Sequence, residues 1–189
     1  MNTLIILAFI GFLLLRKTSQ ASPPLLNKPA PAPTIPLPLL DESTVFRINR
    51  YTGFINDVVN QLGIDPNLLR ALIYVKSGGD ERAQYISPDG EYGYGLTQIT
   101  CGRARMMPQP AASTSIVDKI VNSADCPKLI KPENSIWYGA AYLRAVYQGD
   151  WVDALARYNS PSNMVILNAD AFERARETLL IAEAFRGKV

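Results

Sequence analysis

The chain has 189 residues and a formal net charge of +2, which indicates one domain of roughly 100–150 residues with appended segments and no strong attraction to nucleic acid. It contains no histidine, which excludes Ser-His-Asp and Cys-His nucleophile systems and all His-ligated metal sites. Its two cysteines cannot build a four-thiolate site, so we expect neither a metal nor a cofactor.

Residues 1–17 are expected to form an apolar N-terminal helix. The run MNTLIILAFIGFLLL carries no charged side chain, and Arg16 and Lys17 follow it directly. As a helix these 15 residues would span roughly 22 Å, short of the ~30 Å hydrocarbon core of a bilayer. We interpret the segment as a membrane anchor or a signal-like segment, with a helix buried in a protein assembly as the alternative.

Residues 18–40 are predicted to be a linker. Seven of the fourteen prolines lie between residues 22 and 40, a density that no helix or central strand tolerates. A stiff polyproline-type spacer of this length reaches on the order of 50 Å.

The globular domain is predicted to span residues 41–189 and to begin with two helices. Ser43 and Thr44 are expected to cap the first helix, which runs to Leu62 and stops at Gly63. Asp65 is expected to cap the second, from Pro66 to Ser77, because its apolar residues have helical spacing and two glycines follow.

A polar loop or short irregular hairpin is expected next, up to Ile99, because Ser87-Pro88-Asp89-Gly90 is a strong turn signal. Residues 100–132 are predicted to be irregular, with one short helix over Ser115–Asn122. Three more helices are expected over Pro132–Tyr147, Trp151–Tyr158 and Asn168–Arg186. Strand signals are almost absent, so the predicted fold class is mainly α.

Four motifs occur in order between about residues 45 and 160. They are Lys76-Ser77-Gly78-Gly79 at a helix end, Gly95-Leu96-Thr97-Gln98-Ile99, NSIWYGAAYL from Asn134, and ALARYNSP from Ala154. This order resembles the lytic transglycosylases (SLT type) of the lysozyme-like superfamily. The resemblance implies a lysozyme-like helical fold in which residues 78–99 form one wall of a saccharide cleft. It also implies cleavage of the β-1,4 bond between N-acetylmuramic acid and N-acetylglucosamine in peptidoglycan.

Lys76 stands where the family carries its catalytic glutamate. In the family that carboxylic acid protonates the glycosidic oxygen and then accepts a proton from the C6 hydroxyl as a 1,6-anhydro ring closes. Lysine, with a reference pKa of about 10.4, is a poor substitute, although a cation suits a helix C-terminus. Three explanations stay open: Lys76 is an introduced inactivation, it is natural in a domain that retains only binding, or Glu81 or Glu91 has become the acid.

The other motif positions match the family. The resemblance implies that Tyr158 lies beside the acid as part of the catalytic site, and that Ser77, Gln98 and Asn159 contact substrate. Tyr94 is expected to stack on a sugar ring. Tyr74, Tyr85, Tyr92 and Tyr138 are further candidates for stacking, and we expect about two of these five tyrosines to do so. Ser160-Pro161 replaces the family's usual small residue and glycine.

Cys101 and Cys126 form a disulfide or remain two buried thiols; we predict Cα atoms less than about 7 Å apart.

The expected partners are peptidoglycan glycan strands and either a membrane, through residues 1–17, or a virion or secretion assembly. The basic residues after the apolar run favour a cytoplasmic domain by the positive-inside rule, which suits a phage protein stored before packaging. We expect a membrane-anchored or virion-associated protein that acts in the periplasm or cell wall. The alternative function is a non-catalytic peptidoglycan-binding or structural virion protein on the same fold.

Overall fold

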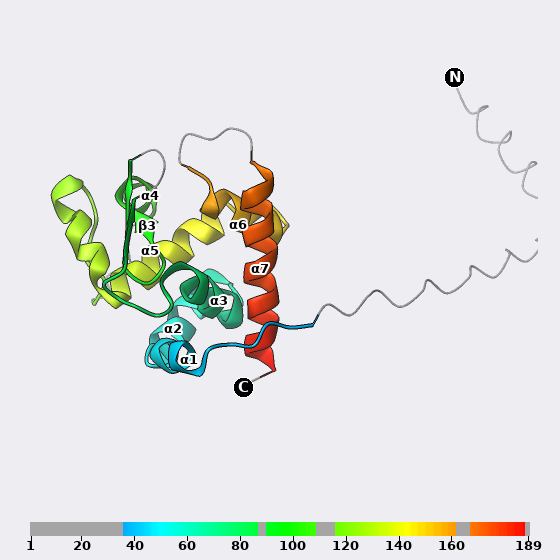
Figure 1. The fold of residues 1–189 in the computed structure, drawn as a ribbon. Coiled ribbons are helices and arrows are strands. Elements are labelled where there is room, and N and C mark those ends of the chain that lie inside the picture. Colours follow the sequence, from blue (N-terminus) through cyan, green and yellow to red (C-terminus); the bar gives the residue numbers. More distant parts are fainter. Residues whose placement is uncertain (1–35, 87–89, 109–115, 162–166, 188–189) are drawn as a thin grey trace, which may run out of the picture. The chain divides into compact units, whose positions relative to one another are not determined.

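The computed structural model describes residues 36–86, 90–108, 116–161 and 167–187, all within the compact unit Pro36–Val189. The predicted helix at residues 1–17 and the linker as far as residue 35 lie outside the described residues. The elements are α1 (Glu42–Asn49), α2 (Thr52–Leu62), α3 (Pro66–Ser77), β1 (Gln84–Ile86), β2 (Tyr92–Tyr94), β3 (Ile99–Thr100), α4 (Cys101–Met106), the 3-10 helix η1 (Ser123–Ile130), α5 (Pro132–Ala145), α6 (Trp151–Asn159) and α7 (Ala169–Arg186). The predicted mainly α architecture is confirmed (Figure 1).

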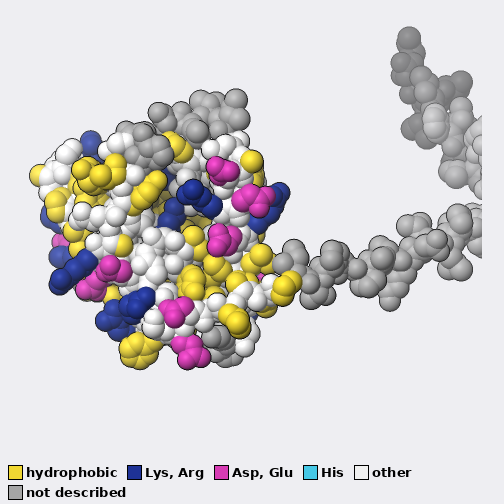
Figure 2. Space-filling model, in the orientation of Figure 1, with side chains coloured by type: hydrophobic (Ala, Val, Ile, Leu, Met, Phe, Trp, Pro, Cys, Tyr) yellow, Lys and Arg dark blue, Asp and Glu magenta, His cyan; other side chains and the backbone are white. Residues whose placement is uncertain are grey.

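The helices enclose one hydrophobic core around α3 and α5. Every residue of α5 from Asn134 to Ala141 is buried, and α3 buries its residues from Leu68 to Ile73. The last helix, α7, packs along both α3 and α6 (Figure 1). Basic and acidic side chains are interspersed over the face of the domain shown in Figure 2. Within the described parts of the chain, no helix is both long and apolar enough to cross a membrane.

Helix α3 has the ends that its sequence predicted. The Asp65 carboxylate accepts a hydrogen bond from the Asn67 N–H at 2.8 Å, Pro66 opens the helix, and Gly78 ends it with φ 59°. Gly79 follows with φ 77°, and a Cβ there would lie 3.0 Å from Arg47 Cβ. Only glycine combines this backbone conformation with so close an approach to α1, which fixes the end of α3.

The predicted single helix from Ser43 to Leu62 is wrong, since the chain forms two helices there. Asp41 is the N-cap instead of Ser43 or Thr44, because its carboxylate accepts the Thr44 N–H at 2.8 Å. The helical run breaks at Tyr51, whose φ and ψ are −101° and 9°. The Tyr51 hydroxyl donates to Glu81 Oε2 at 2.6 Å, a contact thirty residues away in sequence.

The prediction of a helix over Ser115–Asn122 is also wrong for its described part, residues 116–122, which form a turn, bends and irregular backbone. Side chains bind the amides that a helix would need: the Asp118 N–H donates to Asn134 Oδ1 at 2.8 Å, and the Val121 N–H donates to Asp125 Oδ2 at 3.1 Å. The helical segments of this region are α4 and η1, which the sequence did not predict.

A three-stranded antiparallel sheet, in the order β1-β2-β3, occupies the region where the hairpin was expected. The predicted turn residues 87–89 lie outside the described residues. Thr97, between β2 and β3, joins the sheet to α5: its N–H donates to Ser135 Oγ at 2.9 Å and its hydroxyl donates to the Ser135 carbonyl at 2.7 Å. The Gly95–Ile99 loop is therefore fixed on the first turns of α5.

Candidate active site

Lys76 lies in the last turn of α3 and is partly buried. Its Nζ lies 5.5 Å from the centroid of the Tyr158 ring, a cation–π arrangement. Among the described residues it has no hydrogen bond or ion pair of its own. The lysine at the position where the resemblance places the acid therefore lies beside the Tyr158 ring.

The surroundings of Lys76 disfavour its positive charge. Burial, and then the nearby charges of Arg103 and Arg174, lower the pKa of Lys76 to about 8. None of these influences is a carboxylate, so among the described residues the cation–π contact with Tyr158 is the interaction that favours the ammonium. A substantial fraction of the amine is consequently neutral in mildly alkaline solution.

Tyr158 is bound through its hydroxyl and exposes almost nothing, with 2% of its surface accessible. The hydroxyl donates to the Thr97 carbonyl at 3.0 Å, and burial raises the pKa of Tyr158 above its usual value. Its ring meets Tyr142 edge-on at 5.6 Å between centroids. Tyr158 thus offers a ring face to position 76 and holds its own proton at neutral pH.

Arg103, on α4, is a residue that the sequence analysis missed. It is 6% exposed and donates to the Tyr158 carbonyl at 2.7 Å and to the Ser160 carbonyl. Its guanidinium carbon lies 4.8 Å from the Tyr142 ring centroid, and its Nε is buried without a partner among the described residues. Arg103 therefore binds the last carbonyls of α6 and adds a buried cation near Lys76.

Of the other predicted contact residues, Gln98 and Ser77 donate hydrogen bonds within the protein, and Asn159 does not through its amide nitrogen. Gln98 has φ 54°, and its Nε2 donates to the carbonyls of Ala83 and Gly95 at 2.7 Å each, so the amide holds the loop that carries it. Ser77 Oγ donates to the Ile73 carbonyl at 3.1 Å. Asn159 ends α6 and has a buried Nδ2 without a partner in the described part of the chain.

The tyrosines divide into buried and accessible groups. Tyr138 is completely buried and donates to the Asp118 carbonyl at 3.0 Å, so it cannot stack on a sugar. Tyr74 accepts the Asp41 N–H at 3.0 Å. Tyr92 and Tyr94 lie with ring centroids 6.3 Å apart, and both line a pocket of about 210 Å³. Tyr85 on β1 is also exposed.

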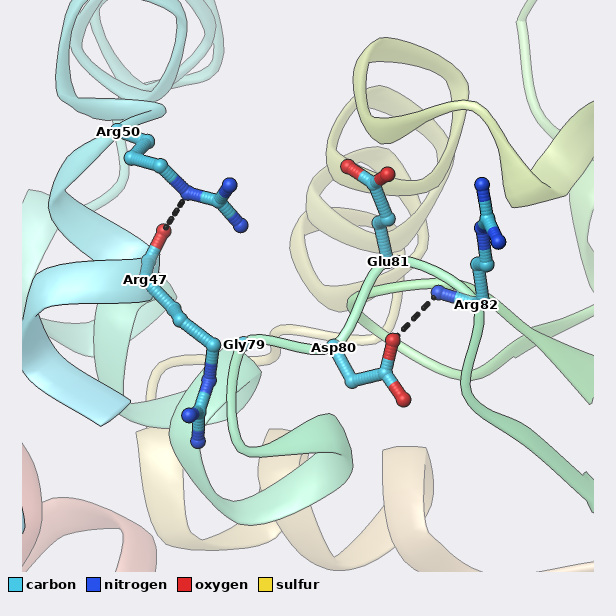
Figure 3. Close-up of a pocket in the computed structure, with 6 residues that line it drawn as sticks. All are labelled: Arg47, Arg50, Gly79, Asp80, Glu81 and Arg82. Atoms are coloured by element: carbon cyan, nitrogen blue, oxygen red, sulfur yellow. Dashed lines mark hydrogen bonds between the residues drawn. The ribbon is translucent and has the colours of Figure 1, made fainter. Parts of the chain in front are cut away.

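The two alternative acids lie in pockets of their own. Glu81 lines a pocket of about 430 Å³, opposite Arg50 (Figure 3). Burial, together with the hydrogen bond to Glu81, raises the pKa of Tyr51 to about 12. Glu91 lines the pocket of Tyr92 and Tyr94, and a Cβ at Gly102 would lie 2.7 Å from Glu91 Oε1. Neither carboxylate is among the groups that shift the pKa of Lys76.

A family model, that of the transglycosylase SLT domain, matches residues 54–178. The chain belongs to the transglycosylase SLT family. Among solved structures, this SLT domain is similar to an inactive mutant of the lytic transglycosylase Slt from Pseudomonas aeruginosa, in which one glutamate is replaced by glutamine. The TM-score is 0.52, the identity is 21%, and the match covers 72% of this chain and 24% of that one. The likeness establishes the lysozyme-like fold, and the chain spans about a quarter of that longer protein. No curated protein matches the chain.

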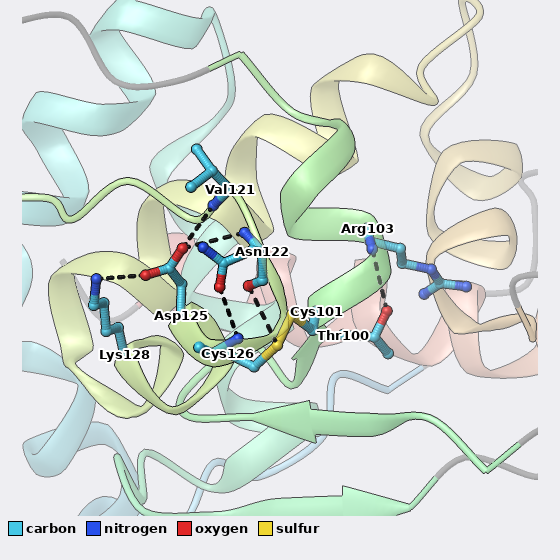
Figure 4. The surroundings of a disulfide bond; sticks show 9 residues. Thr100, Cys101, Arg103, Val121, Asn122, Asp125, Cys126 and Lys128 are labelled. Carbon is cyan, nitrogen blue, oxygen red and sulfur yellow. Dashed lines mark hydrogen bonds and ion pairs between the residues drawn. A yellow bond between two sulfur atoms is a disulfide. The ribbon is translucent and has the colours of Figure 1, made fainter.

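The SLT domain contains the disulfide Cys101–Cys126, with Cα atoms 5.3 Å apart. This distance is within the predicted limit of about 7 Å. The bond joins the start of α4 to η1, where Asp125 binds Lys128 at 2.6 Å (Figure 4). In the described ranges, no cluster of three or more Cys, Asp or Glu side chains could hold a metal ion.

Proposed function

We propose that this SLT domain acts on peptidoglycan glycan strands as a lytic transglycosylase, cleaving the MurNAc-β-1,4-GlcNAc bond, and that Lys76 impairs the reaction. The observation that carries the proposal is the family match, which spans all four motifs, together with an amine at the α3 end where the resemblance expects an acid.

Lys76 meets one requirement of the reaction and fails another. With a pKa of about 8, its ammonium can donate a proton near neutral pH more readily than an ordinary lysine. Positive charge then develops on the sugar, and a carboxylate would stabilise it. An ammonium repels that charge and the neutral amine does not offset it, so catalysis should be weak.

The second candidate function is a non-catalytic peptidoglycan-binding or structural virion protein on the same fold. It is favoured by the cationic surroundings of position 76, since Arg103 and Arg174 suit an anionic group of a ligand better than a general acid. A third arrangement, with Glu81 or Glu91 as the acid, would require substrate to reach the pockets that these residues line.

We further propose that the domain opens the cell wall locally in the periplasm, either tethered through residues 1–17 or carried by a virion or secretion assembly. The disulfide between α4 and η1 supports an oxidising compartment, because such bonds persist outside the reducing cytoplasm. Exposed aromatic rings at Tyr85 and Tyr92 support contact with sugars.

The test is a pull-down of the full chain with purified sacculi in EDTA, followed by mass spectrometry of released products. Binding that survives EDTA, with little or no 1,6-anhydromuramoyl product, is the expected result. Absence of binding would refute both the enzyme and the peptidoglycan-binding module, and would favour a structural role in a virion. Rapid release of anhydro products by the unaltered chain would refute the impairment.

A further inference from the structure

Two pockets of the SLT domain adjoin each other at the loop that follows α3. The first, of about 430 Å³, lies between that loop and the end of α1, and the second, of about 520 Å³, lies between the loop and the junction of η1 with α5. Glu81 and Arg82 line both pockets, whereas Lys76 lines neither. The two pockets therefore form a continuous surface that the reaction proposed at position 76 does not use.

The first pocket holds opposite charges that do not meet. Figure 3 shows the Arg50 guanidinium and the Glu81 carboxylate facing each other across it. Within the described ranges, Glu81 forms no ion pair with Arg50 or Arg82. Arg50 Nε donates to the Arg47 carbonyl at 3.3 Å, but its Nη atoms, like the guanidinium of Arg82, have no hydrogen-bond partner among the described residues. A ligand with both an anionic group and a hydrogen-bond donor would satisfy these groups together.

These charges are held in place by the protein. The Tyr51 hydroxyl donates to Glu81 Oε2 at 2.6 Å, and Oε1 is without a partner in the described part of the chain. The Tyr51 ring also lies 5.6 Å, at its centroid, from the Arg50 guanidinium carbon. The Arg82 N–H donates to Asp80 Oδ1 at 2.9 Å, a bond that closes the loop on itself. A pocket whose charges are already oriented loses less conformational entropy when it binds a ligand.

The second pocket is mainly apolar. Besides the two shared residues, it is lined by Pro127, Ile130 and Pro132 together with Lys128 and Lys131. Each lysine is already paired with an aspartate, at 2.6 Å for Lys128 and 2.7 Å for Lys131. The cations without a carboxylate partner therefore belong to the first pocket and the shared wall, and the second pocket suits an apolar group.

We propose that the two pockets bind the C-terminal residue of a partner protein whose last side chain is large and apolar, such as leucine. The terminal carboxylate accepts hydrogen bonds from the guanidinium groups of Arg50 and Arg82. The N–H of the same residue donates to Glu81 Oε1, and its side chain lies in the second pocket against Ile130. A C-terminal residue presents these three groups from one Cα atom, which matches two pockets that meet at Glu81 and Arg82.

Charge and size favour this occupant over other ligands. Three arginines and two carboxylates line the first pocket, a net charge of +1 that one terminal carboxylate neutralises. A free amino acid would bring an additional ammonium next to Arg50 and Arg82. A peptidoglycan stem peptide that ends in alanine offers only a methyl group to a second pocket of about 520 Å³. A protein C-terminus with a large apolar side chain fits both pockets.

The test is fluorescence polarisation of a fluorescein-labelled Gly-Gly-Ala-Leu peptide with the full chain. We expect the same peptide with a C-terminal amide to bind at least about tenfold more weakly, because the charge-assisted hydrogen bonds are lost. Arg82→Gln should weaken binding of the acid by a similar factor. Arg105→Gln replaces an exposed arginine that lines neither pocket, and as the matched control it should change the affinity by less than about twofold.

Equal binding of the acid and the amide, or no binding at millimolar peptide, would overturn the proposal. Competition separates the other ligands. If free leucine, or a stem peptide that ends in D-Ala-D-Ala, displaces the probe more effectively than unlabelled Gly-Gly-Ala-Leu, then the site takes an amino acid or peptidoglycan and the proposal is wrong. The assay contains no glycan strand, so its result is independent of the cleavage proposed for this domain.

Discussion

Replacing Lys76 by glutamate should create or greatly raise muralytic activity. The substitution supplies the carboxylic acid at the end of α3 and leaves Tyr158, Gln98 and Asn159 unchanged. General acid–base catalysis contributes typically about 10²–10⁴-fold, and we expect a gain of this size. Burial, the largest influence on the Lys76 pKa, should raise the pKa of a glutamate here, while Arg103 and Arg174 oppose that rise.

The cost in stability should be small. A carboxylate at a helix C-terminus is unfavourable by about 0.3–1 kcal/mol, and its attraction to Arg103 and Arg174 partly offsets this. We therefore expect the free energy of unfolding of Lys76→Glu to lie within about 1 kcal/mol of the original value, as measured by urea unfolding.

The assay is turbidity loss of purified sacculi, with mass spectrometry for 1,6-anhydromuramoyl products. Lys76→Gln is the matched control for shape, because it has the size of glutamate without an ionisable group. Lys119→Glu, at an exposed site, controls for the change in net charge. If Lys76→Glu folds and binds sacculi but gives no more product than Lys76→Gln, the reasoning about position 76 is refuted. If the unaltered chain is as active as Lys76→Glu, another residue is the acid, and Glu91→Gln and Glu81→Gln are the next variants to measure.

Three further outcomes concern stability. The pKa of Lys76 in the folded state is lowered to about 8, so its ammonium destabilises the fold fully below that pH. The free energy of unfolding should therefore rise by up to about 3 kcal/mol between pH 7 and 10. Urea titrations at several pH values should show this rise, and Lys76→Met should remove it. Cys101→Ser, which opens a crosslink across 25 residues, should cost about 3 kcal/mol in chemical unfolding; an unchanged midpoint would contradict a structural role for the bond. Gly139→Ala should lower the melting temperature and the free energy of unfolding, the latter by about 1–3 kcal/mol, because the new Cβ would lie 2.3 Å from Thr97 Oγ1. Gly53→Ala, which has open space around the new Cβ, is the control and should not lower either quantity.

Much of the fold could be predicted because its signals are local. Asp65, Pro66 and Gly78 define the ends of α3 within a stretch of fourteen residues, and α5, α6 and α7 follow from apolar periodicity and caps. The same reasoning placed Lys76 in the last turn before a glycine pair. These features depend on hydrogen bonds and side-chain spacing within one helix, which the order of residues specifies directly.

The tertiary structure decided what depends on residues far apart in the chain. The break between α1 and α2 accompanies the contact of Tyr51 with Glu81, and the start of α4 is bonded to η1 through Cys126. Arg103 binds the Tyr158 carbonyl 55 residues away, a contact that leaves no periodic trace in the sequence. The sequence alone therefore determined that position 76 is a lysine at a helix end. Only the tertiary structure, which brings Lys76 over the Tyr158 ring and near Arg103 and Arg174, decided that this lysine is partly buried and that its pKa is lowered.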